Sequence, residues 1–586
     1  MTYRPPLDDI RLALAATGAI DADPDLTASV LDGAGRFAED VLAPLDRIGD
    51  EHPSRLDGGK VVTPPGWDAA YQAFVDGGWP SLSGPEEFGG QGLPHVLASS
   101  VIEIWSSANL AFSLGPLLTQ GAVDALRHAA SPELKARYLP KMVSGEWTGT
   151  MNLTEPQAGT DLGALKTRAV PQADGSYRIF GTKIYITYGD HELSSNIIHL
   201  VLARLPDAPA GTKGISLFVV PKILINPNGS LGARNDLRAT GVEHKLGIHG
   251  SPTCVMSYGE KDGAVGHLVG ELGRGLNHMF VMMNRARLDV GMQGVATAER
   301  ATQRALAYAR ERRQGRTAAT PAGAMAPIVE HPDVRRNLMT MRALTAAARA
   351  LCLATAHALD ESERAPDPAI RAATASRAAL LTPIAKAFAT DSAVDVASLG
   401  VQVHGGSGFI EGTGAAQHYR DARILPIYEG TNGVQAIDLV TRKLPLEGGK
   451  VVATYLAELD ACTAEIAASN LPGLSALAAN LAEANAALRQ ATEWLGHQAT
   501  AHPEAALAGA TPYLRLFSLA AGGVALGAGA LQSARAGSGA PADRRRIAIA
   551  KFFAAGLSPS APGLAAIVMD GTRNLPSAGA DWDGLE

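Results

Sequence analysis

The spacing of hydrophobic residues predicts helices from about residue 25 to residue 145. Apolar positions recur three and four apart in TASVLDGAGRFAEDVLAPLDRI and in VLASSVIEIWSSANLAFSLGPLLTQGAVDALRHAA, which is the period of an amphipathic helix. The segment SPELKARYLPKMVSG follows, with Ser131 as an N-cap candidate and Glu133 close behind it. A helical domain is therefore expected over residues 1–146.

The pattern changes at about residue 147. Short alternating or β-branched runs follow, namely SYRIFGTKIYITYG, NIIHLVLARL, GISLFVVPKI and TCVMSYGE. Turn signals such as Asn226-Pro227-Asn228-Gly229 separate them. We expect a small β-domain over residues 147–262.

The helical period then returns over long, Ala-rich stretches suited to close antiparallel packing. They are GLNHMFVMMNRARLDVGMQGVATAERATQRALAYARERR, VRRNLMTMRALTAAARALCLATAHALD and PIAKAFATDSAVDVASLGVQVHGGSG. A helical bundle is expected over 263–445, and an additional helical domain over 446–586. The predicted fold class is α+β, in the order helices, strands, long-helix bundle, extra helices.

Composition and charge narrow the class of protein. A chain of 586 residues exceeds the size of one hydrophobic core. A net charge of −7 gives no general attraction to nucleic acid or acidic membranes. The cysteines Cys254, Cys352 and Cys462 have no metal or redox spacing and fit a reducing compartment.

The chain shows no targeting or membrane pattern. Its first residues, MTYRPPLDDIRLAL, lack the basic-then-apolar order of a signal peptide. The longest apolar run, residues 516–531, is mostly Ala and Gly and is short for a membrane span. We expect a cytoplasmic protein without membrane insertion.

Several common catalytic motifs are incomplete. HELSS has Ser195 where the zinc motif HExxH requires a second histidine, so no metal site is expected. GGSGF ends in Phe409, where the nucleophile elbow requires glycine. There is no Walker A sequence, and no GxGxxG follows a strand and opens a helix, which argues against a Rossmann dinucleotide site.

The stretch IYEGTNGVQA contains one carboxylate, Glu429, after an apolar approach and before a small polar turn. The residues after it resume a helical pattern. Such a carboxylate is either a helix-start residue favoured by the helix dipole or a base in a dry pocket, where desolvation raises its pKa.

Four other stretches bear on this choice: MNLTEPQAGTDL, FGTKIYITYGDHE, YARERRQGR and VQVHGGSGF, the last leading into HYRDARILPIYEGTNGVQ. In this order and spacing they resemble the acyl-CoA dehydrogenase family over roughly residues 30–445. The length, the C-terminal extension and the opening YRPPLDDI resemble its large bacterial branch. That branch includes the 3-methylmercaptopropionyl-CoA dehydrogenase type and broad-range fatty acyl-CoA dehydrogenases.

The resemblance implies a fold, a cofactor and a reaction. The fold has an N-terminal helical domain, a middle β-domain and a C-terminal four-helix bundle, with FAD at their junction. The implied reaction oxidises an acyl-CoA to the trans-2-enoyl-CoA. Glu429 falls on the catalytic base that takes the α-proton while hydride passes from Cβ to flavin N5, and Gly430 leaves room for the thioester.

The resemblance also assigns cofactor contacts. Arg312 matches an arginine that reaches the FAD of the neighbouring subunit, although RRQGR lacks the phenylalanine usual in that motif. Tyr185 stands where most members carry tryptophan beside the flavin. The remaining FAD contacts implied are Leu153, Thr154, Thr160, Thr187, Gln402, Gly405, Gly406 and Thr431.

The same resemblance implies substrate contacts, an electron acceptor and an oligomeric state. Asn284 and Arg287 match positions near the CoA arm. Ala286 stands at the position where one branch carries its base, which closes that option. The resemblance implies an electron-transfer flavoprotein as acceptor, and Arg312 together with the C-terminal extension favours a homodimer.

Three other activities of this fold stay open at the level of sequence. An acyl-CoA oxidase would pass electrons to oxygen. Nitroalkane oxidases use Asp as the base, and Glu429 argues against them. A non-catalytic flavoprotein that binds nucleic acid would carry a basic C-terminal region, whereas 446–586 is not strongly basic. The acyl group can be methylthio-propanoyl, straight, branched or ring-bearing.

Overall fold

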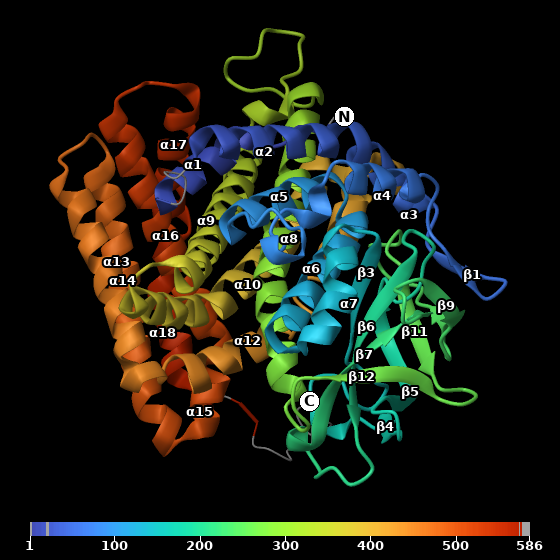
Figure 1. The fold of residues 1–586 in the computed structure, drawn as a ribbon. Helices are drawn as coiled ribbons and strands as arrows, with labels where there is room; N and C mark the ends of the chain where they lie inside the picture. The colour runs from blue at the N-terminus through green and yellow to red at the C-terminus, as the bar shows by residue number, and fades with distance from the viewer. Residues whose placement is uncertain (1–2, 19–22, 574, 577–586) are drawn as a thin grey trace. The chain divides into compact units, whose positions relative to one another are not determined.

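The computed structural model of the protein describes residues 3–18, 23–573, 575 and 576. The chain divides into two compact units. Unit 1 comprises Leu26–Asp289 with Met1–Pro5 and Ala416–Ile424, and unit 2 comprises Val290–Ala415 and Leu425–Glu586 with Pro6–Asp25. Helix α8 (Gly275–Glu311) contributes to both. Figure 1 labels the elements along the chain.

Two helices of unit 1 begin at positions that a side chain caps. The Asn109 side chain accepts a hydrogen bond from the Phe112 N–H at the start of α6. Ser131 caps α7 in the same way through the Leu134 N–H, as the sequence predicts. The helices are α2 (Pro24–Phe37), which continues into the π-helical turn Ala38–Leu42, α3 (Ala43–Glu51), α4 (Trp67–Asp76), α5 (His95–Ala108), α6 (Leu110–Ala129), α7 (Pro132–Val143) and α11 (Ala415–Ala422).

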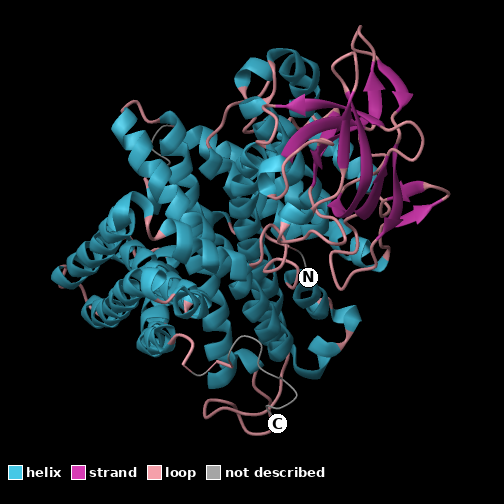
Figure 2. Ribbon diagram, turned by 90° about the horizontal axis from the view of Figure 1, so that it is seen from below, coloured by secondary structure: helices cyan, strands magenta, loops and turns pink. Residues whose placement is uncertain are grey.

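The strands of unit 1 form an eight-stranded sheet, drawn in magenta in Figure 2. The order is β10-β11-β5-β12-β7-β6-β3, and β4 pairs with β5 and β6. β3 lies parallel to β6, and β5 is antiparallel to β11, β12 and β4. The strands are β3 (Trp147–Asn152), β4 (Arg168–Pro171), β5 (Tyr177–Thr187), β6 (Asn196–Arg204), β7 (Ile215–Pro221), β10 (Leu237–Val242), β11 (Thr253–Tyr258) and β12 (Ala264–Val269). Two hairpins lie outside this sheet, β1 (Arg55–Asp57) with β2 (Lys60–Val62), and β8 (Ile223–Ile225) with β9 (Leu231–Arg234).

The sheet separates two hydrophobic cores. Alternate side chains of a strand point to opposite faces, so Leu200 and Leu202 of β6 join a core with α6 and α7. Val201 and Ala203 join the core on the other face. The sheet is therefore covered on both faces, which explains the continuous apolar sequence of β6 and β7.

Unit 2 consists of helices. Those that form the predicted bundle are α8, α9 (Pro332–Arg364), α10 (Pro368–His404) and the shorter α12 (Asn432–Asp438), which continues into the π-helical turn Leu439–Lys443. The N-terminal helix α1 (Leu7–Thr17) also belongs to this unit. The C-terminal helices are α13 (Lys450–Ala468), α14 (Leu474–Ala501), α15 (Pro503–Ala508), α16 (Ala510–Ala536), α17 (Pro541–Gly556) and α18 (Ala561–Asp570).

The apolar helix α16 lies at the centre of the C-terminal region. It packs against α13, α14, α17 and α18, and also against α9 and α10. Among the described residues, two segments are long and apolar enough to cross a membrane by length and composition, Ala510–Ala536 and Pro541–Asp570. The apolar window of the first is 83% buried within the protein, and that of the second is 33% buried. Burial in the core accounts for the composition of α16.

The predicted succession of helices, strands and helices is confirmed, with two local differences. The β1–β2 hairpin lies inside the region expected to be helical, so that expectation is wrong for residues 55–62. The sheet also extends beyond residue 262, because β12 pairs with β5 and β7. Both pieces are short and bounded by glycine, so neither shows a clear alternation.

Candidate active site

Glu429 lies in a tight loop directly before α12 in unit 2. Its φ angle is 57°, in the left-handed region, and Gly430 follows with φ 82°. The Asn432 N–H donates to the Pro426 carbonyl at 2.9 Å and closes the loop. A left-handed backbone at a residue other than glycine costs of order 1–3 kcal/mol and is typical of functional sites.

The helix that follows does not use Glu429 as its first carboxylate. Thr431 is the N-cap of α12, and its hydroxyl accepts the Val434 N–H at 3.2 Å. Glu429 precedes this cap by two residues and lies outside the first helical turn. Glu429 is therefore not the helix-start carboxylate of α12.

A lysine that the sequence analysis missed anchors the same loop. Lys386 lies in the middle of α10 and is fully buried. Its Nζ donates to the Gly430 carbonyl at 3.0 Å and to Asn432 Oδ1 at 2.8 Å. Asn432 in turn donates to Asp391 at 2.7 Å. The available signal was a single cation inside the apolar run LLTPIAKAFA, since a buried lysine requires acceptors.

The residue before Glu429 is also fixed. The hydroxyl of Tyr428 donates a short hydrogen bond to the side chain of Gln293 on α8. Burial, and then the nearby Glu429 carboxylate, raise the pKa of Tyr428 well above its ordinary value. Tyr428 is therefore neutral and belongs to the apolar approach that the sequence predicts.

In unit 1, Leu153 and Thr154 lie in a loop that a buried ion pair holds against β5. Lys183 Nζ lies 2.9 Å from Glu155 Oε1, and the two side chains are 0% and 4% exposed. Lys183 also donates to the Leu153 carbonyl, and the Ile184 N–H donates to the Thr154 carbonyl, both at 2.9 Å. Burial alone would raise the pKa of Glu155. Lys183 and hydrogen bonds from residues near Glu155 instead hold this pKa at about 2.

Tyr185 projects from an irregularity in β5. The register between β5 and β11 shifts between the pairs Cys254–Ile186 and Met256–Lys183, which is a bulge. Tyr185 has φ 59° there, and its side chain is 61% exposed. An exposed aromatic ring on a strained backbone suits a planar ligand.

The other predicted contacts of unit 1 fall on loops and on α8. Thr187 ends β5, next to the bulge, and Thr160 is exposed in the loop after β3. Asn284 is exposed on α8, whereas Arg287 is 9% exposed. Arg287 Nη1 donates to Asn284 Oδ1 at 3.4 Å, so these two side chains form one polar group.

Four predicted contacts of unit 2 lie at the C-terminal ends of α8 and α10, whereas Thr431 lies at the start of α12. The rings of Tyr308 and His404 stack with centroids 4.4 Å apart and join the two helix ends. Arg312 and Gln402 are exposed beside this junction. Gly405 and Gly406 are exposed as well, and a Cβ built on either would meet no atom within 4 Å. The surface here is open enough for an approaching phosphate.

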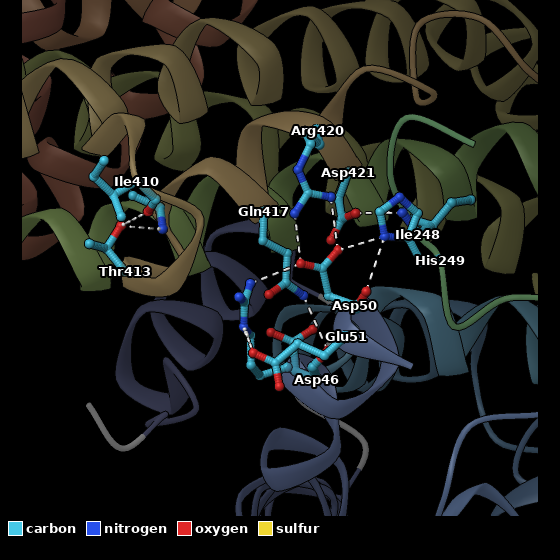
Figure 3. Close-up of polar contacts among 12 residues, drawn as sticks. Asp46, Asp50, Glu51, Ile248, His249, Ile410, Thr413, Gln417, Arg420 and Asp421 are labelled. Atoms are coloured by element: carbon cyan, nitrogen blue, oxygen red, sulfur yellow. Dashed lines mark hydrogen bonds and ion pairs between the residues drawn. The ribbon is translucent and has the colours of Figure 1, made fainter. Parts of the chain in front are cut away.

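The motif HYRDAR has a structural role that the sequence analysis did not assign (Figure 3). Arg420 donates to both carboxylate oxygens of Asp50, at 2.8 and 2.6 Å. His249 Nδ1 lies 2.9 Å from Asp50, and Asp421 accepts the Ile248 N–H. Burial alone would raise the pKa of Asp50, but hydrogen bonds from His249 and Arg420 hold it well below its usual range. The motif thus ties α3 and the 244–250 loop together.

Comparison with known proteins gives the family. The models described as acyl-CoA dehydrogenase N-terminal, middle and C-terminal domains match residues 27–146, 150–260 and 273–444. The chain is 49% identical over 567 residues to 3-methylmercaptopropionyl-CoA dehydrogenase of Ruegeria pomeroyi, covering 94% of this chain and 96% of the relative. The chain belongs to the acyl-CoA dehydrogenase family.

Further comparisons agree with this assignment. A butyryl-CoA dehydrogenase of Syntrophomonas wolfei is 39% identical over 438 residues, with 73% of this chain and 72% of the relative covered. The structure of Caenorhabditis elegans ACDH-11 in complex with C11-CoA has the same fold, with a TM-score of 0.78 at 20% identity and coverage of 94% and 92%. Residues 455–577 match a model described as acetyl-CoA dehydrogenase C-terminal like, which accounts for the extra helices.

This acyl-CoA dehydrogenase therefore carries the activity that its motifs predict, the FAD-dependent dehydrogenation of an acyl-CoA thioester. The predictions of the family, of its large branch and of FAD as cofactor are confirmed. The side chains fit a flavin nucleotide. Tyr185 offers an exposed ring, Gly405 and Gly406 leave open space, and Arg312 is exposed for a phosphate.

Proposed function

We propose that this enzyme dehydrogenates short acyl-CoA thioesters, 3-methylmercaptopropionyl-CoA among them, with Glu429 as the base. The observation that carries the role of Glu429 is its loop, in which a left-handed glutamate is fixed by Thr431, Asn432 and the buried Lys386. The 49% identity to a 3-methylmercaptopropionyl-CoA dehydrogenase supports the substrate. The butyryl-CoA dehydrogenase relative supports a short chain.

The chemistry requires a carboxylate in a dry, rigid place. The α-hydrogen of a thioester is weakly acidic, so the base must lie close to Cα and be poorly solvated. Glu429 takes this proton on a carboxylate oxygen. Its own N–H holds the thioester carbonyl oxygen, where negative charge develops. Gly430 leaves room for the thioester.

FAD, when bound, supplies the acceptor for the hydride that leaves Cβ. We assign its contacts in unit 1 to Thr154 and Thr187 at the ring, with the Leu153 backbone beside them, and to Thr160 near the pyrophosphate. Tyr185 lies against the ring, which its 61% exposure supports. The buried Glu155–Lys183 pair keeps the Leu153–Thr154 loop and β5 in one arrangement.

The contacts in unit 2 imply a homodimer. Gln402, Gly405, Gly406 and Thr431 complete the set, and Arg312 acts on the FAD of the partner subunit. The neighbouring Phe409 and Ile410 are 86% and 60% exposed. Large apolar side chains at such exposure are typical of a surface that a second copy covers, which supports this arrangement.

The remaining assignments concern the substrate arm and the acceptor. The polar pair Asn284–Arg287 binds the CoA arm. An electron-transfer flavoprotein reoxidises the flavin, and the enzyme acts in the cytoplasm without inserting into a membrane. The burial of 83% of the apolar window of α16 supports this last point for that helix, because its buried side chains have no face for lipid.

Anaerobic bleaching of the flavin band tests the proposal. The probes are 3-methylmercaptopropionyl-CoA, butanoyl-CoA and octanoyl-CoA, mixed with the purified holoenzyme without oxygen. We expect full bleaching by the two short esters and slower bleaching by octanoyl-CoA. Flavin that no ester bleaches would refute the proposed substrates. Rapid reoxidation by air alone, without an acceptor protein, would indicate an oxidase.

A further inference from the structure

The segment Tyr185–Tyr188, at the end of β5, has a left-handed backbone at both ends. Tyr185 has φ 59° and Tyr188 has φ 49°. Between them, Ile186 is buried in the core of the sheet, whereas Tyr185 is exposed and Thr187 is partly exposed. A bulky residue adopts this backbone only where neighbouring groups enforce it. Two such residues in one short segment indicate that the surroundings hold it in a single conformation.

The first of these surrounding groups is Thr150 of β3. Its side chain is fully buried, and its hydroxyl donates to the Thr187 carbonyl at 2.7 Å. In the sheet β3 pairs with β6, so this bond joins Thr187 to a strand outside the pairing of β5. The hydroxyl of Thr150 therefore fixes the orientation of the Thr187 peptide group.

The second group is Tyr188 itself, which fixes the far end of the segment. Its hydroxyl donates to the Ala111 carbonyl at 2.9 Å and accepts the indole N–H of Trp67 at 3.1 Å. Its own N–H donates to the Pro252 carbonyl at 2.7 Å. The ring lies against α6 at Gly115, where a Cβ would come within 3.3 Å of it. The phenol is thus held by both its hydroxyl and its ring.

These anchors act on the two residues of the segment that are assigned to the flavin ring, Tyr185 and Thr187. Thr150 and Tyr188 are both buried, so they affect a bound cofactor through the backbone and not by contact. A hydrogen bond requires a narrow range of distance and angle. A small rotation of the Thr187 peptide therefore suffices to take its hydroxyl out of reach of a ring nitrogen.

We propose that Thr150 and Tyr188 are positioning residues for the flavin. They hold the Thr187 hydroxyl within hydrogen-bond reach of N5 and keep the exposed Tyr185 ring against the isoalloxazine. This rests on the proposed function, which assigns Tyr185 and Thr187 to the flavin ring. All the residues of the argument belong to unit 1. They are distinct from the Glu155–Lys183 pair, which fixes the Leu153–Thr154 loop.

A cofactor with one altered atom tests this role without any acyl-CoA. 5-Deaza-FAD carries C–H at position 5, where FAD has the nitrogen N5. Equilibrium dialysis of the full-length apoenzyme against each cofactor gives the two dissociation constants. We expect the wild type to bind FAD about two- to tenfold more tightly than 5-deaza-FAD, the factor that one hydrogen bond contributes.

The variants Thr150→Val and Tyr188→Phe each remove one anchoring hydroxyl and keep the shape of the side chain. Each should bring the ratio of the two dissociation constants toward one, and Thr150→Ser should restore it. A change of stability alone would weaken the binding of both cofactors equally and leave the ratio as in the wild type. Thr240→Val is the matched control, because the exposed Thr240 hydroxyl donates to the Val255 carbonyl of the same sheet. It should leave the ratio unchanged.

Two results would overturn the positioning role. One is a wild-type ratio of one, which would mean that Thr187 makes no bond to N5. The other is a wild-type ratio in the two variants, and either variant decides this if the other does not fold. The proposed substrates are tested separately, by bleaching of the FAD enzyme. Esters that fail to bleach the flavin would refute those substrates and leave the ratios as they are.

Discussion

The ammonium group of Lys386 lies 3.0 Å from the carbonyl oxygen of Gly430, the residue next to the proposed base. Lys386 is fully buried on α10, so this contact fixes one end of the Glu429 loop to a rigid helix. On the other side, Tyr428 precedes the glutamate and donates a hydrogen bond to Gln293 of α8. A glutamate with a left-handed backbone is thus held from both sides.

Replacing Lys386 by methionine should slow flavin bleaching by about ten- to a hundredfold, because loss of a buried charged hydrogen bond costs 1–3 kcal/mol. Removing a cation beside the loop should also raise the apparent pKa of the base, which the pH dependence of the bleaching rate reports. Thr382→Val is the control on the same helix, since Thr382 bonds only its own helix at Ala378. An unchanged rate and pH profile would remove Lys386 from the mechanism.

The substitution Glu429→Gln should reduce the bleaching rate by about 10²–10⁴-fold, the usual contribution of a general base. Its flavin content should equal that of the wild type. Glu447 is a matched control, because it also has a left-handed backbone, with φ 51°, but is exposed and accepts from Ser376. A variant Glu429→Gln that bleaches at the normal rate would exclude Glu429 as the base.

The variant Glu155→Gln should lose flavin and stability, because it leaves the Lys183 cation buried without its carboxylate. Breaking a buried ion pair costs about 3–5 kcal/mol. Flavin absorbance per protein and the urea midpoint measure the two effects. The double variant with Lys183→Met should recover part of the stability. The control is Glu146→Gln, which removes the carboxylate of the exposed pair with Lys141. It should change the free energy of unfolding by less than about 1 kcal/mol.

Glu299 should make the stability of unit 2 depend on acid pH. Burial alone would raise the pKa of Glu299, but Arg342 and Arg349 hold it at about 2. The pKa of a glutamate in the unfolded chain is about 4.3. Because the folded pKa is depressed, the stabilisation is complete above about pH 4.3 and is lost as pH falls toward 2.

Urea midpoints of the wild type and of Glu299→Gln measure this dependence. The free energy of unfolding of the wild type should exceed that of the variant by on the order of 3 kcal/mol at pH 7. This difference should shrink below about pH 4.3. The exposed Glu483 gives the control Glu483→Gln. A gap that stays constant down to pH 3 would contradict the assigned pKa.

The sequence predicts the fold and the family because both leave strong local patterns. Long helical periods and short β-branched runs identify the two kinds of structure, and the motifs around Thr154, Tyr185 and Glu429 identify the family. Lys386 and the Asp50–Arg420 pair were missed, since Asp50 lies 370 positions from Arg420 in the chain. Such partners depend on tertiary packing, which periodicity does not encode.

Helix α1 is made long before its partners, because they lie far along the chain. It packs against α9 and α16, and Asp9 pairs with Arg545 of α17. The contacts of α1 therefore become possible in two steps, first with α9 and later with α16 and α17, since Asp9 lies 536 positions before Arg545. A nascent chain that ends before α16 can make the α1–α9 contact but lacks the helix that covers the remaining side of α1.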